Sequence, residues 1–228
     1  KAHRDRIAFM RIVSGRFDAD KEVYHVQGGK KLRLSRPQQL MAAEREIIEE
    51  AYAGDIIGVF DPGIFSIGDT LCAPGKKFRF DPIPTFAPEH FKRVRSLDTM
   101  KRKQFLKGME QIAQEGAIQI FKTPYTGMEE VIVGVVGTLQ FDVLEYRLKN
   151  EYNVELYMEG LPYEYLRWIE TDDGEPVKEE DLILGTDVKL VEDYKGNQLL
   201  LFGSQWAIGW TEERNKNLTF HEFGGTKF

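Results

Sequence analysis

From residue 131 the chain reads Val131-Ile132-Val133-Gly134-Val135-Val136, an apolar run typical of a buried strand. Gly137-Thr138-Leu139-Gln140-Phe141 follows at once, and its threonine is a residue type that caps helices. Phe141, Leu144 and Leu148 then lie at i, i+3 and i+7, which places them on one face of a helix. This stretch therefore predicts a strand that leads directly into an amphipathic helix.

The segments on either side complete a regular arrangement. Upstream, residues 91–96 can form a strand, and Asp98 can cap a helix that Gly116 ends. Further strands are predicted over 117–121 and 154–158. The order is β-α-β-β-α-β, so we predict an α+β ferredoxin-like domain with two helices on one face of a four-stranded sheet.

The first 85 residues show a different pattern of short strands and turns. Gly28-Gly29 separates strands predicted over 22–27 and 30–36, and two adjacent glycines suit the two-residue primed turn of a hairpin. Other strands are predicted over 54–60 and 68–72. Several short strands without an amphipathic helix predict a small closed antiparallel β-barrel.

A proline-rich segment lies between the two patterns. Residues 81–88 hold three prolines, which fix φ and remove amide donors, so a stiff linker is predicted there. We therefore predict a β-barrel domain at 1–85 and an α+β domain at 86–228. The second domain carries a C-terminal extension, for which we predict paired strands over 188–192 and 198–202. A short helix, capped by Ser204 and holding Trp206 and Trp210, follows those strands.

Composition limits the classes of function. The net charge is −6, and residues 170–228 carry 13 acidic and 6 basic side chains, which excludes a uniformly basic coat for nucleic acid. The acidic run at 170–181 is predicted to be a solvated loop. The single cysteine, Cys72, argues for a reducing compartment, and no apolar run approaches the ~20 residues that span a bilayer. We therefore expect a cytoplasmic protein with no membrane partner.

We find no motif in the sequence that is specific enough to indicate a catalytic or cofactor-binding site. Pro74-Gly75-Lys76-Lys77 lacks the upstream glycine and the hydroxyl of a phosphate loop. The four histidines are scattered, and Cys72 has apolar neighbours that favour an inert thiol. We interpret the carboxylates of Glu44, Glu46, Glu49 and Glu50 as solvent-exposed surface groups rather than as an acid/base pair. We predict no catalytic, cofactor-binding or metal-binding residue in this chain.

Basic residues are the remaining candidates for a functional surface. Two groups stand out, and we expect each to form one patch suited to phosphate oxygens rather than to base edges. The competing interpretation is that these side chains only keep the surface soluble. The groups are Lys30, Lys31, Arg33 and Arg36 at the hairpin, and Lys92, Arg93, Arg95, Lys101, Arg102, Lys103 and Lys107 further on.

Several stretches resemble the release factor 3 family of bacterial translational GTPases, over residues 3–169 and more loosely to the end. The stretches in the first domain and the linker are His3-Arg4-Asp5-Arg6-Ile7-Ala8-Phe9, Gly54-Asp55-Ile56, Gly68-Asp69-Thr70 and Phe86-Ala87-Pro88-Glu89. Those in the second domain are Leu106-Lys107-Gly108, Glu115-Gly116-Ala117, Val136-Gly137-Thr138-Leu139-Gln140-Phe141-Asp142-Val143 and Arg147-Leu148-Lys149-Asn150-Glu151-Tyr152-Asn153-Val154-Glu155. The Gly-Asp pieces are common to translational GTPases, whereas the Leu-Gln-Phe-Asp block and the Phe-Ala-Pro-Glu linker are specific to this family.

The resemblance implies a barrel of the translation-factor domain II type. It also implies a ribosome-dependent GTPase that promotes the departure of class I release factors, with small-subunit rRNA and ribosomal proteins as partners. GTP and Mg would bind in an N-terminal G domain, which would also pack against these domains. Since the chain starts at Lys1 and has no phosphate loop, we expect that domain to lie outside it and the chain itself not to be an enzyme.

Three alternatives remain open on the sequence. The chain could be a free-standing RNA-binding barrel module, although residues 1–88 are close to neutral. It could be the corresponding part of an elongation-factor-G-like protein, which shares the barrel and the βαββαβ domain. An enzyme with an unrecognised carboxylate site would instead require a deep pocket that holds two carboxylates with shifted pKa values.

Overall fold

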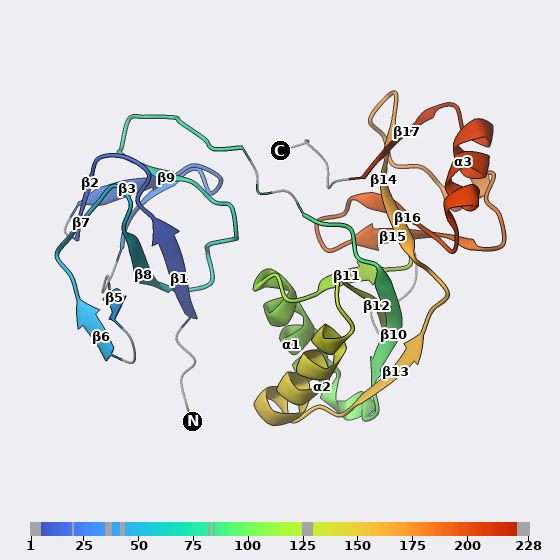
Figure 1. Ribbon diagram of the computed structural model, residues 1–228, viewed down its shortest axis with the longest axis horizontal. Helices are drawn as coiled ribbons and strands as arrows, with labels where there is room; N and C mark the ends of the chain where they lie inside the picture. Colours follow the sequence, from blue (N-terminus) through green and yellow to red (C-terminus); the bar gives the residue numbers. More distant parts are fainter. Residues whose placement is uncertain are drawn as a thin grey trace. The chain divides into compact units, whose positions relative to one another are not determined.

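The computed structural model describes residues 6–19, 21–34, 38–41, 44–81, 83, 85–124 and 130–222. The chain divides into two compact units, Lys1–Ile83 and Pro84–Phe228. Within the described residues, the first unit contains strands but no helix, whereas the second combines strands with helices (Figure 1).

The described residues of the first unit form three antiparallel sheets. The four-stranded sheet has the order β1 (Arg6–Arg11), β8 (Ile56–Asp61), β5 (Gln38–Met41) and β6 (Glu44–Ile47). The three-stranded sheet has the order β4 (Lys30–Arg33), β3 (Glu22–His25) and β9 (Leu71–Cys72), and β2 (Arg16–Asp18) pairs with β7 (Glu50–Tyr52).

Side chains from all three sheets meet in one core. Phe17 of β2, Ala51 of β7 and Ile57 of β8 are buried, and Val23 and Leu32 of the third sheet pack against them. Phe17 and Ala51 each lie between more exposed neighbours, as the two-residue period of a strand requires. Three small sheets around a shared core confirm the predicted β-barrel domain.

The turn between β3 and β4 differs from the two-residue turn predicted at Gly28-Gly29. His25 is the last residue of β3 in register, and it pairs with Lys30, so four residues form the loop. The φ of the second glycine is positive, but that of Gly28 is not. A Cβ at Gly28 would instead lie 2.4 Å from Nδ1 of the buried His25 ring. The first glycine is therefore needed for a close approach to a histidine rather than for turn geometry.

The carboxylate-rich segment predicted to be a solvent-exposed surface contains strands β6 and β7, which the sequence did not predict. Glu49 and Glu50 are exposed, and Ala51 is buried between the exposed side chains of Glu50 and Tyr52. A strand of three residues gives too little alternation to detect from sequence.

The second unit confirms the predicted β-α-β-β-α-β order. Its first six elements are β10 (His90–Ser96), α1 (Arg102–Gln114), β11 (Gln119–Lys122), β12 (Glu130–Val135), α2 (Leu139–Tyr152) and β13 (Leu156–Gly160). Their strands lie in the order β13-β10-β12-β11, so the fourth strand flanks the first and the third separates the first from the second. This is the ferredoxin-like arrangement, with both helices on one side (Figure 1).

The extension continues the same sheet. It comprises β14 (Tyr165–Thr171), β15 (Val188–Asp193), β16 (Gln198–Phe202), α3 (Gln205–Arg214) and β17 (Leu218–His221). β15 pairs with β11 and with β16, so the sheet runs through eight strands from β13 to β17. The predicted pairing of residues 188–192 with 198–202 is confirmed. The acidic run 170–181 begins inside β14 instead of lying wholly in a loop.

Alternation along the strands divides the second unit into separate cores. Val94 and Val133 face α1 and α2, where Phe105, Phe141 and Leu148 complete the first core. On the other face, Phe91, Phe121 and Ile132 contact side chains of β14, β15 and β16. The extension therefore covers part of the sheet face that the two helices leave open.

Ser204 and Gly116 act as predicted, whereas Asp98 caps the 3₁₀ turn Thr99–Lys101 that leads into α1 rather than α1 itself. Asp98 accepts a hydrogen bond from the N–H of Met100, Ser204 accepts one from Ala207, and Gly116 ends the first helix with φ +78°. The side chain of Thr138 makes no capping bond. Gln140 instead holds the backbone that leads into the helix, since its Oε1 accepts hydrogen bonds at 3.0 Å from the N–H groups of Val136 and Gly137.

Candidate nucleic-acid contact surfaces

The hairpin candidates lie together on β4. Lys30, Lys31 and Arg33 are exposed. Nζ of Lys31 lies 3.5 Å from Oε2 of Glu22, and Glu22 also stands directly opposite Arg33 in the register. Acidic neighbours therefore offset part of this positive charge. Arg36 lies outside the described residues.

The candidates on β10 do not form the single patch that the sequence predicted. Lys92 points to the helix side, where its Nζ lies 4.5 Å from the centroid of the Phe141 ring. Arg93 points to the opposite side and its Nη1 lies 3.1 Å from Oε2 of Glu159. The strand period of two separates neighbouring side chains, so the run of basic residues is divided between two faces.

The partners of these cations come from elements that the sequence did not link to them. Arg95 lies over the Tyr157 ring, with Cζ 4.6 Å from the centroid, and both residues stand opposite each other across β10 and β13. Aromatic residues interleaved with the basic run were absent from the sequence, but Tyr157 and Phe141 supply them in space. The contact between Arg95 and Tyr157 could be predicted only from the pairing register of β13 with β10.

The third group lies around the start of α1 and keeps its charge. Arg102, Lys103 and Lys107 are exposed, and Lys101 is half-buried at the end of a 3₁₀ turn (Thr99–Lys101). None of these four side chains forms an ion pair with another described residue. Lys103 and Lys107 are four residues apart, so they project from the same side of the helix. This group presents the least neutralised positive charge of the three.

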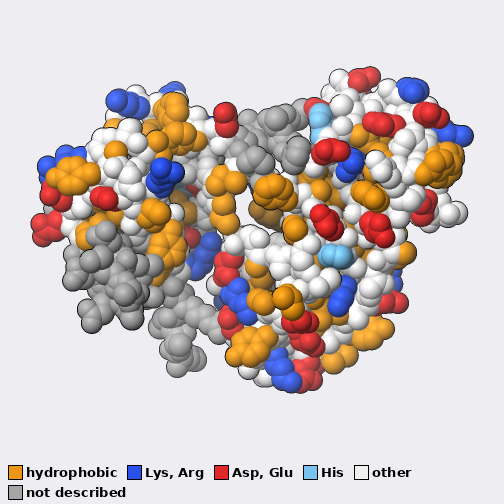
Figure 2. All heavy atoms as spheres, in the orientation of Figure 1, with side chains coloured by type: hydrophobic (Ala, Val, Ile, Leu, Met, Phe, Trp, Pro, Cys, Tyr) orange, Lys and Arg blue, Asp and Glu red, His pale blue; other side chains and the backbone are white. Residues whose placement is uncertain are grey.

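Elsewhere on the surface, charges of both signs are mixed. On the face that Figure 2 shows, Lys and Arg side chains are interspersed with Asp and Glu. Arg147 of α2 is an example, because it is held by Glu115 and Glu151. Hydrogen bonds to these two carboxylates raise the pKa of Arg147 above its usual value. This cation joins the end of α1 to α2 and so has a structural role.

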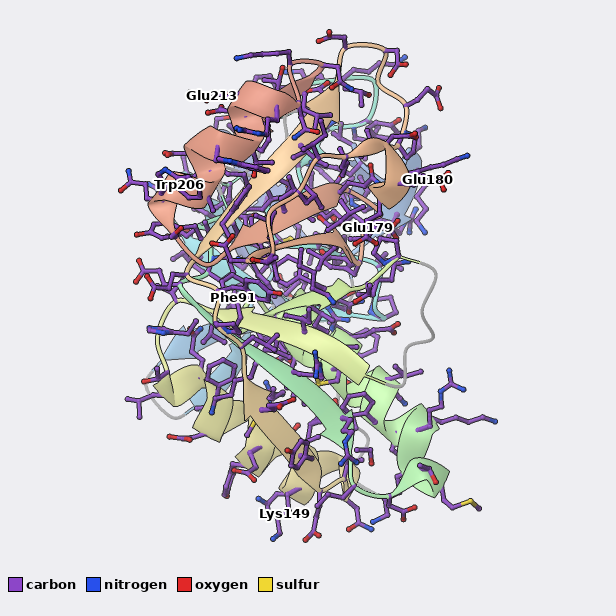
Figure 3. The ribbon with its side chains drawn as sticks, turned by 90° about the vertical axis from the view of Figure 1, so that its right-hand side faces the viewer. Phe91, Lys149, Glu179, Glu180, Trp206 and Glu213 are labelled. Carbon is purple, nitrogen blue, oxygen red and sulfur yellow. The ribbon has the colours of Figure 1, made fainter. Side chains whose placement is uncertain are left out.

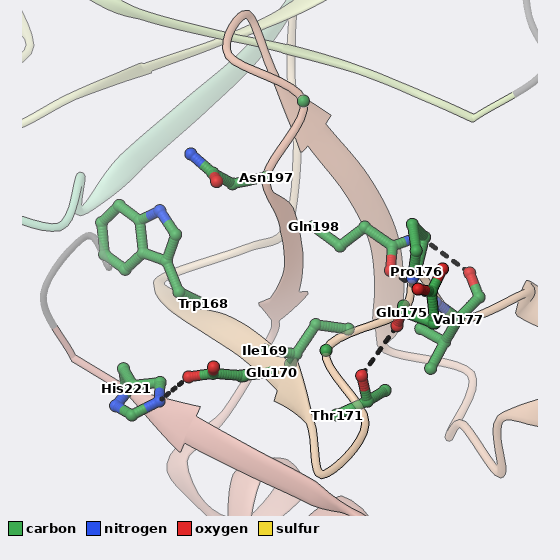
Figure 4. A pocket seen from close by; sticks show the side chains of 12 residues that line it. Trp168, Ile169, Glu170, Thr171, Glu175, Pro176, Val177, Asn197, Gln198 and His221 are labelled. Carbon is green, nitrogen blue, oxygen red and sulfur yellow. Dashed lines mark hydrogen bonds and ion pairs between the residues drawn. The ribbon is translucent and has the colours of Figure 1, made fainter. Parts of the chain in front are cut away.

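Two hollows in the second unit do not provide a buried carboxylate pair. An open groove of about 920 Å³ is lined by Pro88, Phe141 and Tyr163, and burial raises the pKa of Tyr163. The two glutamates that line this groove, Glu89 and Glu164, are exposed. A smaller pocket of about 150 Å³ is shown in Figure 4. There Glu170 is half-buried and lies 3.3 Å from Nε2 of His221. An enzyme with a carboxylate site would need two buried carboxylates in one pocket, and neither of these two hollows contains such a pair.

The segment that looked most like a phosphate loop does not have the geometry of one. The segment at Gly75-Lys76 is a turn in which the N–H of Lys76 bonds to the carbonyl of Ala73, and residues 76–80, which follow it, form no helix. A phosphate loop needs the amides of a helix N-terminus at that point. Cys72, for which the sequence predicted an inert thiol, is half-buried, and its Sγ donates to the carbonyl of Lys76 at 2.9 Å.

Two further searches concern membranes and metals. Among the described residues no helix is both long and apolar enough to cross a membrane. In the same part of the chain, no group of three or more His, Cys, Asp or Glu side chains could hold a metal ion.

Two family models match the chain. Residues 1–74 match "Elongation factor G domain 2", and residues 80–212 match "Class II release factor RF3, C-terminal domain". The second match covers more than half of the chain. The two matched regions follow the two units of the structure.

Curated relatives agree with these models. A protein named peptide chain release factor 3 from Symbiobacterium thermophilum is 53% identical over 219 residues, which cover 96% of this chain and 40% of the relative. Proteins of the same name from Gloeobacter violaceus and Listeria monocytogenes are 46% and 45% identical, over 96% and 95% of this chain and 41% and 40% of their own lengths. The chain therefore spans about two fifths of the length of the curated relatives it matches.

Proposed function

We propose, because the chain belongs to the class II release factor RF3 family, that it is the ribosome-docking portion of a GTP-dependent translation termination factor. In the whole protein, this portion would help class I release factors to dissociate from the ribosome. Its partners would be small-subunit rRNA and ribosomal proteins. The G domain of the whole protein would bind GTP and Mg and would pass its nucleotide state to these two units.

The group at the start of α1 carries this proposal. Lys101, Arg102, Lys103 and Lys107 are cations without an ion-pair partner among the described residues. Folded RNA offers closely spaced phosphates, and Lys and Arg contacts to phosphate give affinity without reading the base sequence. Arg93 and Arg95 and the hairpin residues Lys30, Lys31 and Arg33 are weaker candidates, since acidic or aromatic neighbours already engage most of them.

The test reverses charge in a full-length release factor that contains this chain. We expect Lys101→Glu, Arg102→Glu and Lys103→Glu together to lower the affinity for ribosomes at low salt by at least about tenfold, because three phosphate contacts become repulsive. Co-sedimentation with ribosomes over a range of salt concentrations measures this. The expected salt dependence is shallower in the variant than in the unmodified protein.

A matched control changes the same net charge elsewhere. Lys178→Glu, Lys195→Glu and Lys216→Glu alter exposed lysines of the acidic extension, and we expect the affinity to stay within about twofold. An equal loss in both variants would show a general effect of charge. Unchanged affinity in the first variant would remove the assignment of these residues.

A further inference from the structure

The smaller pocket, drawn in Figure 4, lies where strands β14 and β16 separate. β14 pairs with β16 from Tyr165 to Trp168, and it pairs with β17 from Trp168 to Thr171. The chain that follows β14 folds back, and the N–H and carbonyl of Val177 bond to the side-chain amide of Gln198. A cavity of about 150 Å³ remains between these segments.

Strand geometry brings three polar side chains to this pocket. Trp168 and Glu170 are two residues apart on β14, so they lie on the same face of the strand. His221 stands opposite Trp168 in the register with β17, and its Nε2 lies 3.3 Å from Oε2 of Glu170. The pocket therefore places an indole beside a carboxylate that an imidazole positions.

The indole N–H of Trp168 is an unused hydrogen-bond donor. Trp168 is only 6% exposed, and its side chain makes no hydrogen bond with another residue in the part of the chain that the structure describes. Figure 4 shows the nitrogen on the side of the ring toward Asn197, another residue of the lining. A buried tryptophan N–H usually has an acceptor, and it can only donate. The site therefore calls for a ligand that presents an acceptor, such as a carbonyl oxygen.

The charge around the pocket selects a cationic ligand. None of the lining residues is lysine or arginine, whereas two are glutamates. Residues 170–198 carry ten acidic and three basic side chains, and one of the three, Lys178, lies 3.7 Å from Glu180. Figure 3 shows Glu179 and Glu180 on the side of the extension away from α3. Such a surface attracts cations and repels phosphate.

The volume of the pocket limits the ligand to one side chain. Pockets that hold drug-sized ligands measure ~300–1,000 Å³, whereas this one measures about 150 Å³. Pro176 and Val177 contribute apolar groups to the lining. Apolar walls beside carboxylates suit lysine and arginine, whose methylene stems pack on apolar surface while the charged head stays in a polar environment.

We propose that this pocket binds one arginine or lysine side chain from a basic segment of another protein. The carboxylate of Glu170, which His221 positions, holds the charged head. A backbone carbonyl beside that side chain accepts the hydrogen bond from Nε1 of Trp168. A free polyamine supplies the charge but no such acceptor. The inference goes beyond the proposed function, because it requires neither the ribosome nor the cations around α1.

A titration of the 228-residue chain followed by nuclear magnetic resonance tests the proposal. The probe is a blocked Gly-Arg-Gly peptide, and the signal is the indole N–H of Trp168, identified by its loss in Trp168→Phe. We expect this signal to shift saturably. The same peptide with citrulline, an uncharged isostere of arginine, should bind at least about tenfold more weakly. Equal binding of the two peptides, no shift at millimolar arginine peptide, or an equal shift with spermidine would overturn the inference.

Substitutions show whether the pocket is the site. We expect Glu170→Gln, which keeps the shape of the side chain and removes its charge, to weaken binding of the arginine peptide about tenfold. The matched control Glu212→Gln neutralises an exposed carboxylate of α3, and the affinity should stay within about twofold. Circular dichroism checks that both variants keep their fold. Unchanged affinity in Glu170→Gln, or an equal loss in both variants, would contradict the assignment.

Discussion

Gln140 fixes the backbone just ahead of α2 and ties it to the end of the neighbouring loop. Its Oε1 accepts from two backbone N–H groups ahead of α2, and its Nε2 donates to the carbonyl of Ala117 at 2.6 Å. The neighbouring Thr138 has helical φ and ψ, so its hydroxyl is not placed to cap the helix. The predicted cap residue, Thr138, does stand at the N-cap position of α2, but its side chain makes no capping bond.

This difference gives a matched pair of substitutions. We expect Gln140→Ala to destabilise the second unit by about 1–2 kcal/mol, because two N–H groups and one carbonyl lose their partner. Thr138→Ala should change the stability by less than about 0.5 kcal/mol. Urea unfolding followed by circular dichroism measures both. A larger effect of the threonine change would show that the hydroxyl of Thr138, and not the amide of Gln140, stabilises the start of α2.

Sequence patterns identified residues whose partners are near in the chain and missed those whose partners are distant. The face at Phe141, Leu144 and Leu148 could be predicted, since helical spacing alone decides it. The need for glycine at position 28 could not, because it depends on the buried ring of His25. The contact of Arg95 with Tyr157 was invisible for the same reason, as only strand register brings them together.

At the scale of elements, α1 and α2 approach each other closely at one glycine. A Cβ at Gly108 would lie 2.6 Å from Cδ2 of Leu148 and 3.0 Å from the ring of Tyr152. Both neighbours belong to α2, and Leu148 is fully buried in the first core. Neither can move aside without disturbing the packing, so glycine sets the distance between the helices.

Two mid-helix glycines should therefore respond in opposite directions to alanine. We expect Gly108→Ala to destabilise the chain by about 1–2 kcal/mol, since overpacking outweighs the better helix propensity. Gly209→Ala should stabilise it by about 0.5–1 kcal/mol, because its Cβ would enter open space. Thermal unfolding of both variants gives the signs. Stabilisation by Gly108→Ala would disprove the close helix contact.

Element order was more predictable than element pairing. The β-α-β-β-α-β order and the hairpin of 188–192 with 198–202 followed from periodicity and turn residues. The pairing of β11 with β15 joins residues 121–122 with 192–193, and no local pattern indicates it. Short strands such as β2 and β7 were missed because three residues give too little alternation to detect.

At the scale of the whole molecule, the chain combines two units that match two different family models. Neither the sequence nor the turn at Gly75-Lys76 offers a phosphate-binding loop. We therefore expect the isolated chain to bind no GTP in a calorimetric titration at micromolar protein. A full-length release factor titrated in parallel is the positive control. A titration that shows tight, one-to-one binding of GTP to the isolated chain would refute the expectation that the nucleotide site lies outside it.

The unbroken sheet of the second unit has a mechanical consequence. Adjacent strands from β13 to β17 are tied by backbone hydrogen bonds, and Phe121 at the centre also packs against the strands of the extension. The joint between the two halves of the sheet is short, since β11 and β15 pair over residues 121–122 and 192–193. The buried ring of Phe121 therefore anchors the extension to the ferredoxin-like strands, and loss of that ring would loosen the extension while leaving each half folded.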